Sequence, residues 1–246
     1  MVDGRSLDGE KILQADICIV GAGVAGITVA REFIGSSAQI LLVESGDTSP
    51  KPETQRLSKG EVNRPYFDLD DSCLRGVGGS AWGWSLDLPD QRGVRLRALN
   101  AIDFEERPEI PYSGWPLTLS DLKPHYQRAH EAFEIGPYND GERCWSSSDD
   151  SLLPAQDCEI ETTIFRFGDA RLFTHKYPKD LRQASNITIL TNTTVLELET
   201  NRSANHVRAA RSQTLTGSSI RIESPHFVVA AGGLQTPRLL LLSNRN

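Results

Sequence analysis

Three glycines and one glutamate are spaced as in sites that bind an adenine dinucleotide. Gly21, Gly23 and Gly26 form a GxGxxG sequence, and Glu44 follows Gly26 by 18 residues. In such a turn the first glycine permits the tight bend, the second lets the backbone approach a pyrophosphate, and the third lets the helix pack on the strand. Unpaired N–H groups at the start of that helix attract the phosphates. The Glu44 carboxylate is placed to accept hydrogen bonds from ribose hydroxyls, and its charge disfavours a 2′-phosphate and hence NADP.

The strands and the helix around these residues must position them relative to one another. Residues 16–20 form a continuous apolar run that predicts a buried strand. Apolar residues at helical spacing over residues 27–34 predict a helix that stops at Gly35, and residues 39–43 predict a second buried strand ending at Glu44. A GxGxxG sequence is weak evidence alone, where it can be a turn that only packs a helix tightly. Between a strand and a helix, with an acidic residue after the next strand, it indicates dinucleotide binding.

The rest of the chain bears on the choice between FAD and NAD. A nicotinamide-binding domain continues as alternating strands and helices. Here residues 47–71 are polar and proline-punctuated and predict a loop, and Ser120 is a candidate N-cap for a later helix. A last buried strand is predicted at residues 226–230 and a last helix at 234–242. Before them come short β-prone runs that predict a meander, at residues 187–190, 195–198, 207–215 and 220–222. This interrupted order favours a flavoprotein.

A second glycine-rich segment strengthens that choice. Residues 75–84 read RGVGGSAWGW, and we call them the glycine-aromatic segment. Together with the GxGxxG turn and the sequence Glu44-Ser45-Gly46, it resembles the glucose–methanol–choline (GMC) family of flavoprotein oxidoreductases, especially the bacterial branch that oxidises sugars and alcohols. The resemblance covers nearly the whole chain from Asp16 to Asn244. Further matching segments lie at residues 102–105, 113–116, 166–168 and 230–238.

The resemblance implies an α/β fold. An FAD-binding Rossmann-like βαβ domain with a β-meander would be interrupted by a partial substrate or cap region, and the C-terminal half of the family fold would be absent. The implied division is residues 1–95 for the first part of the FAD-binding domain and 96–185 for the inserted region. Residues 186–246 would then supply the return strands and last helix of the FAD-binding domain.

The resemblance also implies which residues contact FAD. Gly78, Gly79 and Ser80 would lie against the pyrophosphate and isoalloxazine. Trp82 and Trp84 would lie beside the flavin. Val195 would meet the adenine through its backbone, and residues 231–232 would pass close to the ADP portion. Some relatives attach FAD covalently through a histidine, but the corresponding position here is Gly83, so non-covalent FAD is expected. The full predicted cofactor-binding set is Gly21, Gly23, Gly26, Glu44, Ser45, Arg75, Gly78, Gly79, Ser80, Trp82, Val195, Ala231 and Gly232.

The implied activity is oxidation of an alcohol or sugar hydroxyl by hydride transfer to the flavin. In the family, the catalytic histidine and its His or Asn partner come from the C-terminal half, and none of the five histidines here lies in a segment that matches that motif. We therefore assign no catalytic residue and expect a chain truncated before its active site. Two alternatives stay open. The chain could be a non-catalytic fragment or split-protein piece that binds FAD and needs a partner chain, or an NAD-dependent dehydrogenase.

The composition excludes several other classes of protein. The formal net charge is -7 with both signs interspersed, which disfavours a nucleic-acid partner. Four cysteines show neither CxxC pairing nor zinc-ligand spacing, so no metal site is expected. The first fifteen residues are polar and lack a signal-peptide core, and no apolar run approaches the length of a membrane span. A cytoplasmic enzyme with a small-molecule alcohol or sugar substrate is therefore expected.

Overall fold

The computed structural model describes residues 1–63, 65, 67–83, 85–87, 92–138, 165–169 and 171–244. The chain divides into two compact units, one made of Met1–Trp84 with Ala170–Asn246 and the other of Ser85–Asp169. Trp84 lies outside the described residues, so its place beside the flavin stays a prediction.

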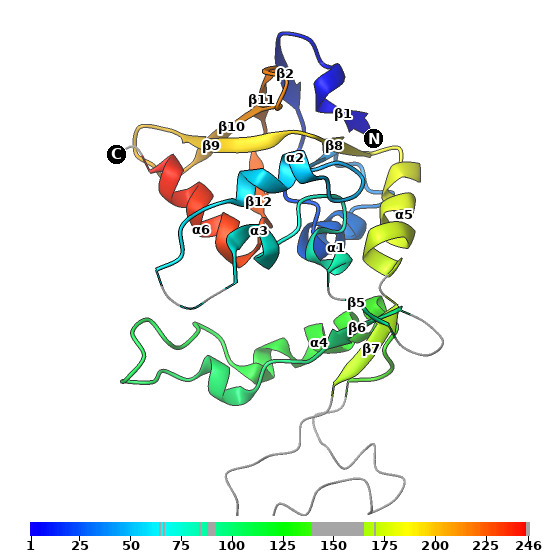
Figure 1. Ribbon diagram of the computed structural model, residues 1–246, viewed down its shortest axis with the longest axis vertical. Helices are drawn as coiled ribbons and strands as arrows, with labels where there is room; N and C mark the ends of the chain where they lie inside the picture. The colour runs from blue at the N-terminus through cyan, green and yellow to red at the C-terminus, as the bar shows by residue number, and fades with distance from the viewer. Residues whose placement is uncertain are drawn as a thin grey trace, which may run out of the picture. The chain divides into compact units, whose positions relative to one another are not determined.

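The first unit is built on a five-stranded parallel sheet with the strand order β1-β8-β4-β3-β12 (Figure 1). Strand β3 (Ile17–Val20), helix α1 (Val24–Glu32) and strand β4 (Ile40–Val43) form the predicted strand–turn–helix–strand unit. The predicted Rossmann-like α/β fold is therefore confirmed. The other strands of this sheet are β1 (Val2–Asp3), β8 (Ile187–Thr191) and β12 (His226–Val229).

Side chains of the central strands are buried on both faces of this sheet. Cys18 and Val20 point into one apolar cluster, while Ile19 between them points to the opposite face, because successive strand residues alternate. Ile19 pairs with Leu42, whose Cδ1 lies only 3.4 Å from where a Cβ on Gly26 would stand. Helix α1 thus covers the Ile19 face, and helix α5 (Tyr177–Gln183) packs beside it.

A second sheet covers the other face of the parallel sheet. Strands β9 (Thr194–Thr200), β10 (Val207–Gln213) and β11 (Ser219–Glu223) are antiparallel, and β2 (Glu10–Gln14) joins β11 in parallel. Helix α6 (Gly232–Ser243) packs on β9 (Figure 1). Side chains from this sheet and α6 share one core with those of β3, β4 and β8: Cys18, Val20, Leu41, Val43, Leu190, Leu198, Ala210, Ile220, Ile222 and Leu239.

Three details of the first unit differ from the prediction. The run at residues 187–190 is a strand, but β8 belongs to the parallel sheet and not to the meander. Residues 10–14 form a strand that no pattern indicated, because most of its side chains are exposed at the sheet edge. Residues 47–71 are not one loop, since they contain helices α2 (Pro52–Gln55) and α3 (Leu69–Ser72) with a short 3₁₀ turn between.

The described residues of the second unit include a small antiparallel sheet and a long helix. The sheet has the order β5-β6-β7, with β5 at Ser85–Asp87, β6 at Arg92–Leu96 and β7 at Arg166–Asp169. Helix α4 spans Leu119–Phe133, and its N-cap is Thr118, so the predicted N-cap at Ser120 was wrong. Thr118 Oγ1 accepts from the Asp121 N–H, and the Asp121 carboxylate accepts from the Thr118 N–H at 2.8 Å. This reciprocal pair is a capping box. Over the described residues, no helix has the length and apolarity to cross a membrane.

Candidate cofactor site

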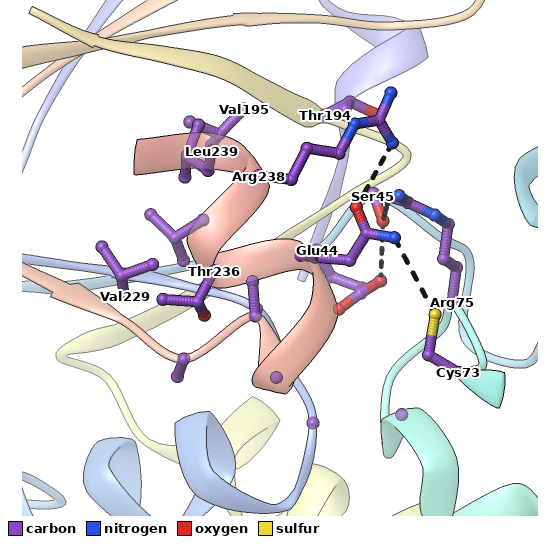
Figure 2. Close-up of a pocket in the computed structure, with 18 of the residues that line it drawn as sticks. Glu44, Ser45, Cys73, Arg75, Thr194, Val195, Val229, Thr236, Arg238 and Leu239 are labelled. Atoms are coloured by element: carbon purple, nitrogen blue, oxygen red, sulfur yellow. Dashed lines mark hydrogen bonds between the residues drawn. The ribbon is translucent and has the colours of Figure 1, made fainter. Parts of the chain in front are cut away.

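A cavity of about 870 Å³ lies in the first unit where the parallel sheet, the glycine-aromatic segment and α6 meet (Figure 2). Its volume falls in the range of pockets that enclose small molecules. Ten of the predicted cofactor residues line this cavity: Gly21, Gly23, Glu44, Ser45, Arg75, Gly79, Ser80, Val195, Ala231 and Gly232. Residues predicted from four separate parts of the sequence therefore converge on one site.

Each glycine of the GxGxxG turn is required for a different structural reason. Gly21 adopts φ +103°, and a Cβ there would stand 2.6 Å from the Ala230 carbonyl oxygen, at the end of β12. A Cβ on Gly26 would overlap the Gly21 carbonyl oxygen, so this glycine sets the approach of α1 to the turn. At Gly23 the nearest protein atom would be the Cα of Gly79, 4.0 Å away. The space in front of Gly23 is thus open to the cavity, as expected where a ligand approaches the backbone.

Glu44 joins the two glycine-rich segments. Its Oε2 accepts from the Ala22 N–H at 2.9 Å, within the GxGxxG turn. Its Oε1 accepts from the Gly46 N–H at 2.8 Å and from the Gly76 N–H at 3.0 Å, the latter within the glycine-aromatic segment. The Ser45 hydroxyl donates to the same oxygen at 3.2 Å. A carboxylate oxygen has two lone pairs, so Oε2 keeps acceptor capacity for a ribose hydroxyl.

Burial raises the pKa of Glu44, while the N–H groups of Gly46 and Ala22 and the charge of Arg75 act in the opposite direction. Burial also lowers the pKa of Arg75, which the Glu44 charge opposes and the nearby Arg238 reinforces. A hydroxyl bridges the two charges, since Arg75 Nη1 donates to Ser45 Oγ at 2.8 Å. The acid predicted to bind ribose is therefore also a structural joint of the cavity wall.

The glycine-aromatic segment lies directly against the GxGxxG turn. The Gly78 N–H donates to the Ala22 carbonyl at 2.8 Å, and Gly23 and Gly78 form an isolated parallel bridge. Gly79 adopts φ +55°, and a Cβ there would stand 2.9 Å from the Gly23 Cα. Two backbones thus approach so closely that side chains on both would not fit, which leaves polar backbone groups on the cavity wall. Such a wall fits the diphosphate of a dinucleotide.

Three predicted cofactor residues do not line this cavity: Gly26, Gly78 and Trp82. Gly26 and Gly78 serve the packing of the turn and the segment. The Trp82 indole N–H donates to the Val77 carbonyl at 2.9 Å, and its ring lies 5.5 Å from that of His175. Both Trp82 and His175 line a smaller cavity of about 370 Å³. The predicted place of Trp82 beside the flavin thus stays a prediction without support from this geometry.

Helix α6 supplies a wall that the sequence prediction did not include. Its side chains Gln235, Arg238, Leu239 and Leu242 line the cavity together with Val195 of β9. Figure 2 labels Arg238, Leu239 and Val195 among these lining residues. The α6 spacing of three, four and seven residues is that of one helix face. Helical periodicity was therefore the signal that could have found them. The apolar members form a surface suited to an adenine ring.

No histidine of the first unit lines the cavity, since His175, His206 and His226 are absent from its wall. Glu44 is its one carboxylate among the described residues, and it is held by protein donors. The described wall can bind and orient a cofactor, but it offers no group poised to take a proton from a substrate hydroxyl.

Comparisons with known proteins agree with this reading of the fold. A family model described as FAD dependent oxidoreductase matches residues 16–245. Lysine-specific histone demethylase 1 homolog 1 of Arabidopsis thaliana is 28% identical over 99 residues, which are 40% of this chain and 11% of that protein.

Solved structures extend the likeness of fold to almost the whole chain. Formate oxidase of Aspergillus oryzae RIB40 matches 94% of this chain at 16% identity with a TM-score of 0.50, and the match covers 48% of that protein. Pyridoxine 4-oxidase of Mesorbium loti matches 93% at 18% identity with a TM-score of 0.49, covering 51% of that protein. The chain thus spans about half the length of these structures. The NAD-dependent alternative has no support among these matches. The chain belongs to the family of FAD dependent oxidoreductases, and its cofactor is FAD.

Proposed function

We propose that this chain holds FAD non-covalently in the cavity between the GxGxxG turn and helix α6, as the cofactor-binding part of a GMC-type oxidoreductase. One observation carries the proposal. Ten residues chosen from the sequence for contact with FAD line a single cavity of suitable volume.

Different parts of the cavity wall are suited to different parts of FAD. Gly21, Gly23 and the start of α1 offer N–H groups and close backbone approach to the diphosphate. The free lone pair of Glu44 Oε2 accepts from a ribose hydroxyl. Val195 and Leu239 supply the apolar surface for the adenine. Gly83 has no side chain that could form a covalent bond to the flavin, which supports non-covalent binding.

The substrate of the whole enzyme is proposed to be an alcohol or sugar. Support comes from the order of motifs along the chain, in which the GxGxxG turn, the glycine-aromatic segment and the segment at residues 230–238 follow one another as in that family. Bound FAD accepts the hydride that such a substrate gives up. Because the cavity wall in the first unit carries no histidine, we expect this chain to bind FAD without oxidising alcohols by itself.

The test is purification of the chain followed by addition of FAD, removal of the excess, and measurement of flavin absorption and fluorescence. Bound flavin that is released into the supernatant on denaturation supports the proposal. Absence of any bound flavin contradicts the binding site, and flavin that stays with the precipitated chain contradicts non-covalent attachment. FMN is the matched control ligand, because it lacks the adenosine for which Glu44 and Val195 are proposed. Bleaching of the bound flavin by an alcohol or sugar under anaerobic conditions contradicts the expected inactivity of the chain.

A further inference from the structure

Two arginines from distant parts of the sequence meet at one wall of the cavity. Arg75 comes from the glycine-aromatic segment and Arg238 from α6, and both line the cavity. They share an acceptor, since Arg75 Nη2 donates to the Leu57 carbonyl at 3.4 Å and Arg238 Nη1 donates to the same oxygen at 3.1 Å. Figure 2 shows Arg238 extending from the helix, with its guanidinium beside Thr194. Two positive side chains are thus held close together.

Negative charge at this wall does not balance the two guanidinium groups. In the described part of the chain, neither Arg75 nor Arg238 forms an ion pair with a carboxylate. The charged residues that line the cavity are Glu44, Arg75 and Arg238, so one carboxylate faces two cations. Arg75 reaches Glu44 through the Ser45 hydroxyl, and three backbone N–H groups already bind Glu44. Arg238, an exposed residue, is therefore the cation of this wall that has no carboxylate beside it in the described part of the chain.

Arg238 also has hydrogen-bond donors that no acceptor in the described residues engages. A guanidinium carries five N–H donors. The Nη1 atom of Arg238 makes two hydrogen bonds, both to neutral acceptors: the Leu57 carbonyl and the Gln235 Oε1 at 3.4 Å. No acceptor among the described residues engages its Nε or Nη2. A planar cation with free paired donors is suited to bidentate binding of a phosphate.

We propose that Arg238 and Arg75 form a phosphate-binding subsite at the Glu44 side of the cavity. The proposal rests on the proposed function, in which the adenosine of FAD lies beside Glu44. It also revises the expectation that Glu44 repels a 2′-phosphate, because the charge of Glu44 is outweighed by two neighbouring cations. The phosphate can belong to the adenosine ribose of a nucleotide, or it can be a free anion bound beside the cofactor.

Nucleotide binding to the apoprotein tests the subsite directly. Titration calorimetry with AMP and with adenosine 2′,5′-bisphosphate compares two ligands that differ by one phosphate. We expect the bisphosphate to bind about tenfold more tightly, the effect of one charge-assisted interaction. Arg238→Gln should remove this difference. Arg202→Gln, in an exposed turn away from the cavity, should keep it. Equal or weaker binding of the bisphosphate, or an unchanged ratio in Arg238→Gln, rules out a nucleotide phosphate at the subsite and leaves only a free anion to be tested.

Inorganic phosphate distinguishes the source of the anion. If phosphate raises the melting temperature of FAD-loaded protein, and Arg238→Gln abolishes the rise, then a free anion occupies the subsite beside the cofactor. If phosphate has no such effect but the bisphosphate preference is present, the phosphate belongs to the nucleotide. Failure of both effects refutes the subsite. Failure of FAD to bind, with the bisphosphate preference intact, refutes the proposed function alone.

Discussion

Gly23→Ala separates the role of this glycine in the fold from its role toward the cofactor. Gly23 has φ -76° and ψ -172°, a conformation open to alanine. A Cβ there would lie 4.0 Å from its nearest protein neighbour, the Cα of Gly79, which is ordinary contact. Because alanine restricts the unfolded chain, we expect the free energy of unfolding of the apoprotein to stay the same or to rise by about 0.4–1 kcal/mol.

The same methyl group should weaken FAD binding strongly. It would project into the space that we assign to the diphosphate, and forcing an extra methyl into a filled site costs about 1–3 kcal/mol. At 1.4 kcal/mol for each factor of ten, that cost corresponds to roughly 5- to 140-fold weaker binding. Urea denaturation without FAD measures the stability, and titration of FAD by its fluorescence measures the affinity.

Gly26→Ala is the matched control in the same turn. Its Cβ would overlap the Gly21 carbonyl oxygen, so this variant should lose stability before any ligand is added. The reasoning fails if Gly23→Ala unfolds the apoprotein, because the open space at Gly23 would then be wrong. It also fails if Gly23→Ala binds FAD as tightly as the native chain, because the cofactor would then not approach this backbone.

Three further predictions concern a carboxyl group, two thiols and a helix cap. Burial raises the pKa of Glu44 in the folded state. The contribution of Glu44 to stability is therefore greatest at pH values below its unfolded pKa of about 4.3, and it is lost as pH rises through the folded pKa. Glu44→Gln should flatten the pH dependence of the free energy of unfolding in that acidic window. Burial raises the pKa of the Cys18 thiol to about 12, so iodoacetamide should spare Cys18 but label Cys73. Cys73 lines the cavity, so bound FAD should slow its labelling. An unchanged rate of Cys73 labelling with FAD, measured by peptide mass spectrometry, would contradict this prediction. Thr118→Ala should cost about 1 kcal/mol of stability and Ser120→Ala much less, and equal losses in thermal melts would contradict the capping box at Thr118.

The nucleotide-binding core was predictable because its signals are local. A continuous apolar run, a GxGxxG turn and an acid after the second strand all belong to one stretch of chain, so the β3–α1–β4 unit needed no tertiary information. The N-cap of α4 was also predictable from residues close together in the sequence. Thr118 and Asp121 have the spacing of a capping box, and choosing Ser120 overlooked the partner three residues after Thr118.

Other features depend on contacts that a linear pattern does not contain. Strand β8 has the same short β-prone pattern as β9, and only its pairing with β4 and β1 places it in the parallel sheet. Strand β2 lies at an edge with mostly exposed side chains, so its sequence shows no buried face. The joining role of Glu44 was hidden for a similar reason. Its partner Gly76 was not among the predicted cofactor residues, and only the fold brings the Gly76 N–H near the Glu44 carboxylate.

The pairing of β12 with β3 sets the order in which the cavity can be assembled. The turn at Gly21 is synthesised about 200 residues before the Ala230 backbone against which it packs and before the α6 wall. Contacts between such distant segments form slowly because a long loop must close first. The cavity therefore has no complete wall until α6 has left the ribosome. Cofactor loading must therefore follow the synthesis of α6, and until then the nucleotide site lacks one of its walls.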